Sequence, residues 1–189
     1  IRRQRQMCIR DRSQIVSRIC AICSVAHALT SIRVTEKIFG VRPSRQTELF
    51  RDLQWRGENI ESHALHLFLL AAPDYLGYPS GPAMAADYPE AVALGLRLKK
   101  LGNLIQRTVG GREIHQVNAV PGGLGRVPDE AALVALRHAL KAARPDIEAA
   151  LDLVRTLPAT RPFQGETIFA ALRQDEEYRY DVGSEVVFL

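Results

Sequence analysis

The 189-residue chain lacks the features that mark several large classes of protein. It has only three cysteines, which cannot make a disulfide framework, so a reducing, cytoplasmic compartment is the default expectation. No apolar run reaches the length of a membrane span, since even the stretch from Leu65 to Ala72 is too short. No signal peptide is visible either.

Signs of nucleic-acid binding and of repeat architecture are missing as well. The net charge of +4 is spread along the chain, and no lysine or arginine cluster alternates with aromatic residues, which argues against nucleic acid as a partner. There is no internal repeat and no low-complexity segment. The composition, 47% apolar and 24% charged, is that of an ordinary globular protein long enough for one domain with a sizeable core.

Two of the cysteines stand together in the stretch from Ser17 to His27. Cys20 and Cys23 are three residues apart, and residues at helical spacings of three or four have Cβ atoms roughly 5–6 Å apart, so both sulfurs can reach one metal centre. A helix N-terminus also lowers the pKa of a thiol, and the thiolate is the form that binds metal. His27 follows one turn after Cys23, where it could ligate the metal or hydrogen-bond to a ligating sulfur. We therefore expect a metal site where a loop runs into a helix.

A Cys-x-x-Cys pair by itself is compatible with several kinds of site. It could be half of a zinc site, part of an iron–sulfur site, a redox pair or two small buried residues. Zinc and cluster sites usually need four ligands, whereas this chain has three cysteines. No thioredoxin-like strand pattern precedes the pair.

The longer string Arg18-x-Cys20-x-x-Cys23-x-x-x-His27 is more specific. It resembles the N-terminal metal-binding signature of the nickel–iron hydrogenase large (alpha) subunit, in the soluble, cytoplasmic, cofactor-linked branch of that family. Two further blocks resemble the family in the expected order, one from Ser62 to Asp74 and one from Gly110 to Gly123. Three ordered blocks are much harder to match by chance than one motif.

The resemblance implies a centre in which four cysteine thiolates hold nickel, and two of them bridge to an iron that carries carbon monoxide and cyanide. Soft sulfur ligands suit such a centre. On this resemblance Cys20 is a terminal nickel ligand and Cys23 a nickel–iron bridge, both catalytic. Arg18 and His27 surround the metals, and His115 lies near them or on a proton path. The second Cys-x-x-Cys of the family is absent, so the chain offers half a site.

The resemblance also implies an activity and partners. The full protein would oxidise hydrogen or reduce protons by heterolytic chemistry, together with an iron–sulfur small subunit and further electron-transfer subunits. We expect the polypeptide as given to be inactive alone. The alternative is a non-enzymatic helical interaction module whose cysteine pair is structural or binds zinc.

Both ends of the sequence predict a fragment. Residues 1–12 resemble the translated end of a sequencing-library adapter, so we assign the truncated large-subunit domain to residues 13–189 and give Cys8 no function. No aspartate or glutamate lies between Arg12 and Cys20, where the family usually has an acidic residue that relays protons. The last residues, Val186 to Leu189, are apolar. We expect exposed apolar surface there and around the cysteine pair.

Periodicity predicts a mainly α fold, a bundle of long helices with a small, incomplete β portion. Helices are expected over 24–39, 45–72, 87–109 and 128–157, with Pro73 ending the second and Pro145 kinking the last. Short strands are expected over 112–117 and within 177–189.

Within the second and third helices the pattern predicts the buried faces. The apolar stripes are Leu49, Leu53, Ile60, Ala64 and Leu67 in the second helix, and Leu94, Leu98, Leu101 and Ile105 in the third. Gly95 and Gly102 would let another helix approach closely. His63 and His66, near the C-terminal end of the second helix, are interpreted as packed or dipole-stabilised histidines rather than ligands.

Overall fold

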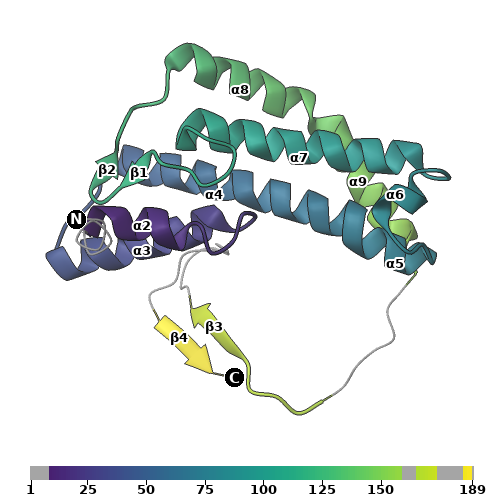
Figure 1. Ribbon diagram of the computed structural model, residues 1–189, viewed down its shortest axis with the longest axis horizontal. Coiled ribbons are helices and arrows are strands. Elements are labelled where there is room, and N and C mark those ends of the chain that lie inside the picture. Colours follow the sequence, from purple (N-terminus) through teal and green to yellow (C-terminus); the bar gives the residue numbers. More distant parts are fainter. Residues whose placement is uncertain (1–8, 159–164, 174–184, 189) are drawn as a thin grey trace. The chain divides into compact units, whose positions relative to one another are not determined.

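The computed structural model describes residues 9–158, 165–173 and 185–188, and divides the chain into a unit of residues 1–157 and a unit of residues 158–189. The predicted mainly α class is confirmed (Figure 1). The elements of the first unit are α2 (Ile9–Val16), α3 (Ser24–Phe39), α4 (Arg45–His66), the π-helical turn η1 (Leu67–Ala71), α5 (Ala72–Leu76), α6 (Gly81–Met84), α7 (Pro89–Gly110), β1 (Ala119–Val120), β2 (Gly123–Leu124), α8 (Glu130–Ala142) and α9 (Arg144–Thr156). The second unit holds β3 (Ala170–Arg173) and β4 (Glu185–Phe188). None of the described helices is long and apolar enough to cross a membrane.

Helix α3 has the bounds that the sequence predicts. It ends at Gly40, which adopts the left-handed conformation with φ 66° and lets Val41 N–H donate to Glu36 O at 2.9 Å. Its inner face packs Val25, Leu29 and Ile32 into a small core. Ser44 then starts α4 by accepting the Thr47 N–H at 3.2 Å, as expected of an N-cap serine.

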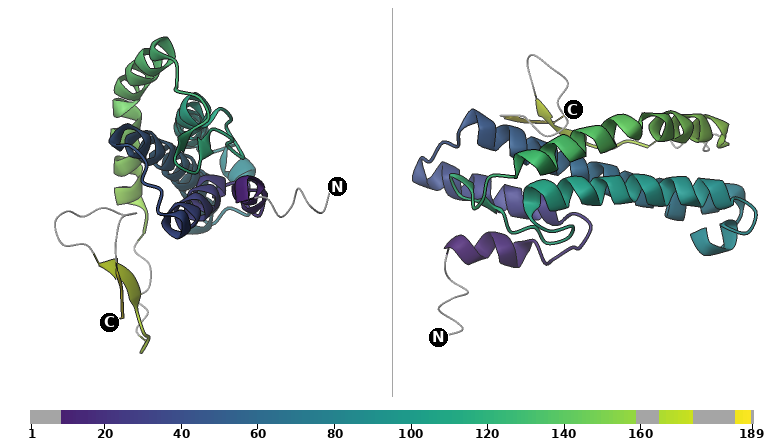
Figure 2. Two further views of the ribbon diagram at one scale, coloured as in Figure 1. Left: turned by 90° about the vertical axis from the view of Figure 1, so that its left-hand side faces the viewer. Right: turned by 90° about the horizontal axis from the view of Figure 1, so that it is seen from above.

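Helices α4 and α7 pack against each other along their lengths, and α8 and α9 lie against α7 (Figures 1 and 2). The predicted stripe of α7 is buried throughout. Glycines set the closeness of the pair: a Cβ on Gly102 would stand 2.6 Å from Gly57 O, and one on Gly95 would stand 2.5 Å from Phe68 Cβ. Both glycines therefore act in packing, as predicted.

Of the stripe predicted for α4, Ala64 is buried and Leu67 packs against the core, but the rest of the buried face is polar, contrary to the prediction. Leu49 is 51% exposed, while the buried face carries Thr47, Arg51, Gln54, Gly57, Glu58, Glu61 and Ala64. Most of these polar side chains have partners there, whereas the buried amide of Gln54 has no hydrogen bond to any described residue. Arg51, for example, donates to Glu36 Oε1 at 2.7 Å and to Val120 O at 2.9 Å.

Pro73 does not end the second helix, contrary to the prediction. The chain continues through η1 into α5 and stops only at Gly77, which has φ 78°. Proline lacks an N–H and its ring crowds the preceding turn of an α-helix. The wider π-helical turn just before Pro73 accommodates both effects, so the helix widens instead of breaking.

The strand predicted over 112–117 is also wrong. Residues 112–115 form bends after α7 and residues 116–117 belong to no helix or strand, and His115 has a positive φ of 53°, far from extended backbone. The strands come next, β1 pairing with β2 in an antiparallel hairpin. The kink at Pro145 is confirmed, since α8 and α9 are separated at Ala143.

In the second unit β3 and β4 pair antiparallel, with Ala170 opposite Phe188. Strand β4 lies within the stretch predicted as strand, whereas β3 was not predicted. Residues 174–184 and Leu189 of that region lie outside the described residues.

Candidate metal centre

The cysteine pair lies on the loop of residues 17–24, called the cysteine loop below, between α2 and α3. Cys23 is the N-cap residue of α3, so the predicted junction of loop and helix is confirmed. The loop ends are buried, Ser17 being 1% and Ser24 0% exposed, whereas Ile19 between them is 71% exposed. Both cysteines are half-buried. The exposed middle of the loop thus leaves the cysteine pair accessible to solvent, while the buried serines anchor the two ends of the loop.

The two sulfurs converge, as the spacing predicted. Cys23 N–H donates to Cys20 Sγ at 3.4 Å. The Cys23 thiol also hydrogen-bonds to the Cys20 sulfur and, with the N–H groups of Cys23 and Ile22, lowers the pKa of Cys20. The same thiol–thiol bond, together with burial, raises the pKa of Cys23 to about 11. The pair therefore presents one favoured thiolate beside one thiol.

A third group at this junction, Glu58 of α4, was missed by the sequence analysis. Its carboxylate accepts the N–H of Val25 at 2.5 Å and of Ala26 at 3.1 Å. It thereby caps α3, which has no cap bond from the Cys23 side chain. Glu58 is 3% exposed; burial raises its pKa to about 7, although the two N–H bonds oppose this and Glu61 adds to it.

A signal for Glu58 was present in the sequence. Arg51, Gln54, Glu58 and Glu61 follow helical spacing, which marks one polar stripe along α4. Proximity along the chain points to the segment before Cys20 as the place for an acidic residue, whereas the proximity of Glu58 across two helices is not visible in the sequence.

A chain of buried polar side chains leads away from the cysteine loop. Ser24 Oγ donates to Gln116 Oε1 at 3.1 Å, and Gln116 Nε2 donates to Gln106 Oε1. Gln106 Nε2 then donates to Glu61 Oε2 at 2.6 Å, and Lys99 Nζ lies 2.8 Å from Glu61 Oε1. The chain ties the start of α3 to α7 through groups that are satisfied in the interior.

Of the other predicted site residues, His115 bonds to the ends of the cysteine loop, whereas the side chains of Arg18 and His27 have no hydrogen bond to either cysteine. His115 contacts Ser17 and Ser24, the two ends of the loop. Arg18 is exposed and donates to Gln14 O at 2.5 Å. The backbone of His27 donates to Cys23 O at 3.3 Å, and among the described residues its ring has no hydrogen bond.

The donor set fits half of a sulfur-rich metal site. Two soft sulfurs, one favoured as thiolate, converge at a helix N-terminus and can bind nickel, iron or zinc. In the part of the chain that the structure describes, no three His, Cys, Asp or Glu side chains gather around one point. A four-ligand centre here needs further ligands beyond these two cysteines.

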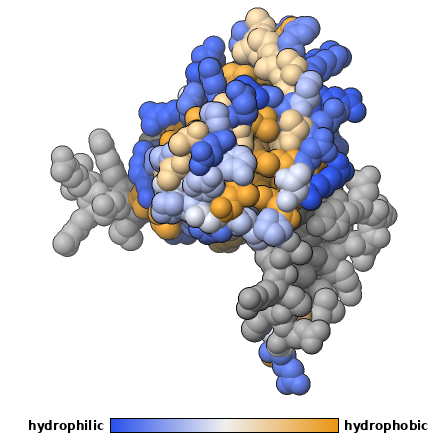
Figure 3. Space-filling view, turned by 90° about the vertical axis from the view of Figure 1, so that its right-hand side faces the viewer, coloured by the Kyte–Doolittle hydropathy of each residue, from blue (hydrophilic) through white to orange (hydrophobic). Residues whose placement is uncertain are grey.

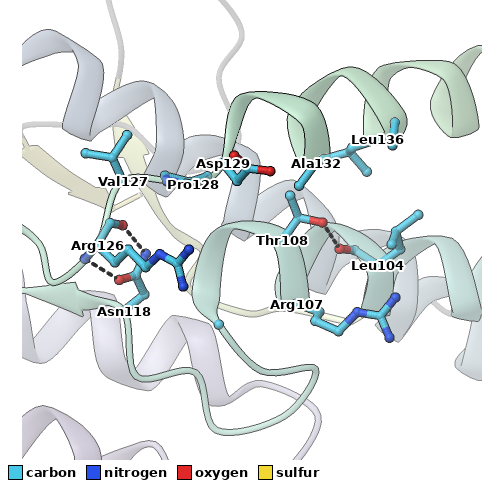
Figure 4. A pocket seen from close by; sticks show the side chains of 12 residues that line it. Leu104, Arg107, Thr108, Asn118, Arg126, Val127, Pro128, Asp129, Ala132 and Leu136 are labelled. Atoms are coloured by element: carbon cyan, nitrogen blue, oxygen red, sulfur yellow. Dashed lines mark hydrogen bonds between the residues drawn. The ribbon is translucent and has the colours of Figure 1, made fainter.

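A separate cavity of about 490 Å³ lies between the C-terminal end of α7 and the start of α8 (Figure 4). Its polar groups serve local structure: Asn118 Nδ2 donates to Arg126 O at 2.8 Å, and Arg107 pairs with Glu113 at 3.2 Å. It includes none of the predicted site residues. The cysteine loop therefore remains the candidate centre.

Comparison with known proteins points to one family. A family model described as nickel-dependent hydrogenase matches residues 3–104. Sulfhydrogenase 2 subunit alpha of Pyrococcus furiosus is 48% identical over 64% of this chain and 29% of that protein. Sulfhydrogenase 1 subunit alpha of the same organism is 38% identical over 84% of this chain and 37% of that protein.

Solved structures agree with the sequence matches. An NAD+-reducing [NiFe]-hydrogenase in the H2-reduced state superposes with a TM-score of 0.73 at 31% identity, covering 77% of this chain and 34% of that one. A [NiFeSe]-hydrogenase of Dm. baculatum has a TM-score of 0.63 at 23% identity, which shows the shared fold. The chain spans about a third of the length of these relatives.

Proposed function

The chain belongs to the nickel-dependent hydrogenase family, and on that premise we propose that it is the N-terminal part of the catalytic large subunit of a nickel–iron hydrogenase. The observation that carries the proposal is the convergence of the Cys20 and Cys23 sulfurs at the start of α3. The full subunit would oxidise hydrogen or reduce protons, and this polypeptide alone would be inactive because it supplies half of the ligands.

The two cysteines would have different roles in the centre. Cys20, with its lowered pKa, would hold nickel, and Cys23 would hold nickel together with an iron that carries carbon monoxide and cyanide. When bound, the nickel–iron centre would supply the heterolytic splitting of hydrogen. Arg18 and His27 would lie around the metals, where hydrogen bonds to ligands tune such centres.

The chain's own contribution near the cysteines is a buried carboxyl. Glu58 holds the first turn of α3, and its pKa of about 7 lets it keep or give up a proton at Oε under neutral conditions. It would serve in place of the acidic residue that the sequence lacks before Cys20.

An apolar rim around the loop supports a protein partner. Ile15, Ile19 and Ile22 are 47%, 71% and 39% exposed beside the cysteines. We propose that an iron–sulfur small subunit covers this rim, with further electron-transfer subunits beyond it, and that the complex is cytoplasmic. Exposed apolar side chains favour protein contact over solvent.

The extent of the domain is part of the same proposal. Residues 13–189 would belong to the subunit. The assignment of residues 1–12, and with them Cys8, to a foreign segment stays a prediction; reading the genomic DNA upstream of Ser13 would test it.

The decisive experiment uses the full-length subunit encoded by the source DNA, matured with its own accessory proteins. Nickel and iron content and dye-linked hydrogen uptake would be measured for wild type, Cys20→Ser, Cys23→Ser and the surface control Asp52→Asn. We expect both cysteine variants to lose nickel and uptake, since each removes a thiolate ligand. Asp52→Asn removes only an exposed ion pair with Arg56 and should behave as wild type.

Two outcomes would overturn the proposal. A full-length wild-type subunit that binds zinc and no nickel would favour the alternative of an interaction module with a structural cysteine pair. Full nickel content and hydrogen uptake in Cys23→Ser would remove that cysteine from the centre.

A further inference from the structure

His115 bridges the two ends of the cysteine loop. Its backbone N–H donates to Ser24 Oγ at 3.3 Å, and its ring Nδ1 lies 2.8 Å from Ser17 O. A carbonyl oxygen can only accept, so Nδ1 carries the hydrogen and donates. His115, which is more than ninety positions from either serine in the sequence, thus contacts both buried ends of the cysteine loop.

The position of His115 is itself fixed. Gln116 beside it is buried and bonded to Ser24 and Gln106, and it packs against Gly110, where a Cβ would stand 2.5 Å from Gln116 Cγ. His115 has φ 53°, a conformation that glycine adopts without cost and histidine adopts at some cost. Glycine would serve this backbone better, so what the histidine adds is the ring's hydrogen bond to Ser17.

That bond acts on the cysteines. Ser17 and Ser24 are the buried residues before and after Cys20 and Cys23, whose intervening neighbours are exposed. The N–H groups of Arg18 and Ile19 still bond to the end of α2, so Cys20 to Cys23 is the part of the loop without such anchors. Because His115 bonds to both Ser17 and Ser24, it limits the conformations of the loop between them. This restraint keeps Cys23 N–H directed at the Cys20 sulfur.

We infer that His115 is a positioning residue for the cysteine pair: its imidazole clamps the ends of the cysteine loop and presets the convergence of the two sulfurs before metal enters. The inference rests on the proposed function in taking the sulfurs as metal ligands, whereas the clamp itself is a property of the chain without metal.

The test uses substitutions that all tolerate a positive φ. Asparagine places its Nδ2 donor where histidine has Nδ1, whereas aspartate places an oxygen there that cannot donate to Ser17 O, and glycine places nothing. His115→Asn, His115→Asp and His115→Gly therefore separate the ring's hydrogen bond from the backbone conformation. His138→Ala, on an exposed position of α8, controls for loss of a histidine.

Site-resolved hydrogen exchange of the 189-residue chain without metal is the first measurement. We expect the Cys23 amide to exchange roughly tenfold faster in His115→Asp and His115→Gly, as loss of one restraining bond allows, and at the wild-type rate in His115→Asn and His138→Ala. The Val25 amide, which donates to Glu58, is the internal reference and should stay protected in all of them. Unchanged Cys23 exchange in both His115→Asp and His115→Gly would overturn the inference. Loss of the helical circular dichroism in His115→Gly would also overturn it, because His115 would then determine the fold.

Nickel content of the matured full-length subunit is the second measurement. We expect retention in His115→Asn and loss in His115→Asp. Equal nickel in those two variants would contradict the positioning role. Absence of nickel from the wild-type subunit would instead contradict the proposed function, and the exchange result would still decide whether the clamp exists.

Discussion

At the scale of single residues, the role of a side chain in this protein depends on its contacts with other helices. Glu58 lies far from the cysteines in sequence, yet its carboxylate caps the helix that begins at Cys23. Glu36 and Arg51 likewise form a buried pair that also holds the β1–β2 hairpin, since Gly122 N–H donates to Glu36 Oε1 at 2.6 Å. Each of these contacts gives a measurable consequence for stability.

For Glu58 the consequence is a dependence on pH. The unfolded chain releases the proton near pH 4.5, whereas the folded chain, with a pKa of about 7, keeps it longer. Between these values the folded state binds more protons, so its stability falls as pH rises, by ~1.4 kcal/mol per pH unit.

We therefore expect the stability of wild type, relative to Glu58→Gln, to decline across this window and to level off above it. Urea denaturation at several pH values checks this. Glu90→Gln, on the first turn of α7, controls for the loss of a carboxylate. A wild-type minus Glu58→Gln difference that is flat from acid to neutral pH would contradict the raised pKa.

For Arg51 the consequence is a large loss of stability. Its side chain is 0% exposed, and Arg51→Leu would leave Glu36 buried without its cation. Breaking a buried pair in this way costs about 3–5 kcal/mol. Arg56→Leu, which removes an exposed pair on the same helix, should cost less than about 1 kcal/mol. Similar urea midpoints for the two variants would show that the buried pair contributes no more than a surface one.

At the level of elements, the contact between α4 and α7 depends on missing side chains. Gly102 faces the backbone of α4, with Gly57 O and Glu61 N each 2.6 Å from the place of a Cβ. Backbone cannot move aside as a side chain can, so a methyl group here must separate the helices.

We expect Gly102→Ala to destabilise the protein by about 1–3 kcal/mol, although alanine is the better helix former. Gly123→Ala is the matched control, because nothing lies within 4 Å of its Cβ position. Thermal unfolding of both variants measures the difference. A Gly102→Ala protein as stable as Gly123→Ala would show that the helices are less closely packed than described.

At the scale of the whole molecule, two of the places in the first unit where apolar side chains are exposed bear on assembly. One is the end that carries α5, α6 and α9, where apolar side chains meet solvent among polar ones (Figure 3). There a groove of about 240 Å³ is lined by α4, α7 and the Ile147, Leu151 and Val154 face of α9. The other is the rim of Ile15, Ile19 and Ile22 around the cysteine loop. Exposure around the cysteine pair was expected from the sequence; the side chains of Val186 to Leu189 lie outside the described residues.

The rim gives a prediction about assembly. In the full-length protein, Ile19→Lys should leave the thermal midpoint of the isolated large subunit unchanged, because a 71% exposed side chain contributes little to folding. It should abolish co-purification with the iron–sulfur small subunit, because a charge would be buried in the interface. Ile19→Val keeps the apolar character and should co-purify as wild type. Normal co-purification of Ile19→Lys would exclude the rim from the interface.

What the sequence determined by itself was local. The spacing of Cys20 and Cys23, the stop at Gly40, the cap at Ser44 and the stripe of α7 all follow from neighbours within a few residues, and the structure confirms each. Helix propensities, caps and thiol spacing depend on residues within one or two helical turns, so they can be predicted from the sequence alone. The motif that indicated the family is equally local, and the comparisons confirm the family.

What only the tertiary structure decided depends on groups distant in sequence. The inner face of α4 can be polar because its side chains bind Glu36, Gln106 and Lys99 on other helices. His115 is no strand residue because Ser17 and Ser24 hold it in a turn. Burial penalises a polar group only when it has no partner, and the partner is chosen by packing, which a linear pattern does not contain.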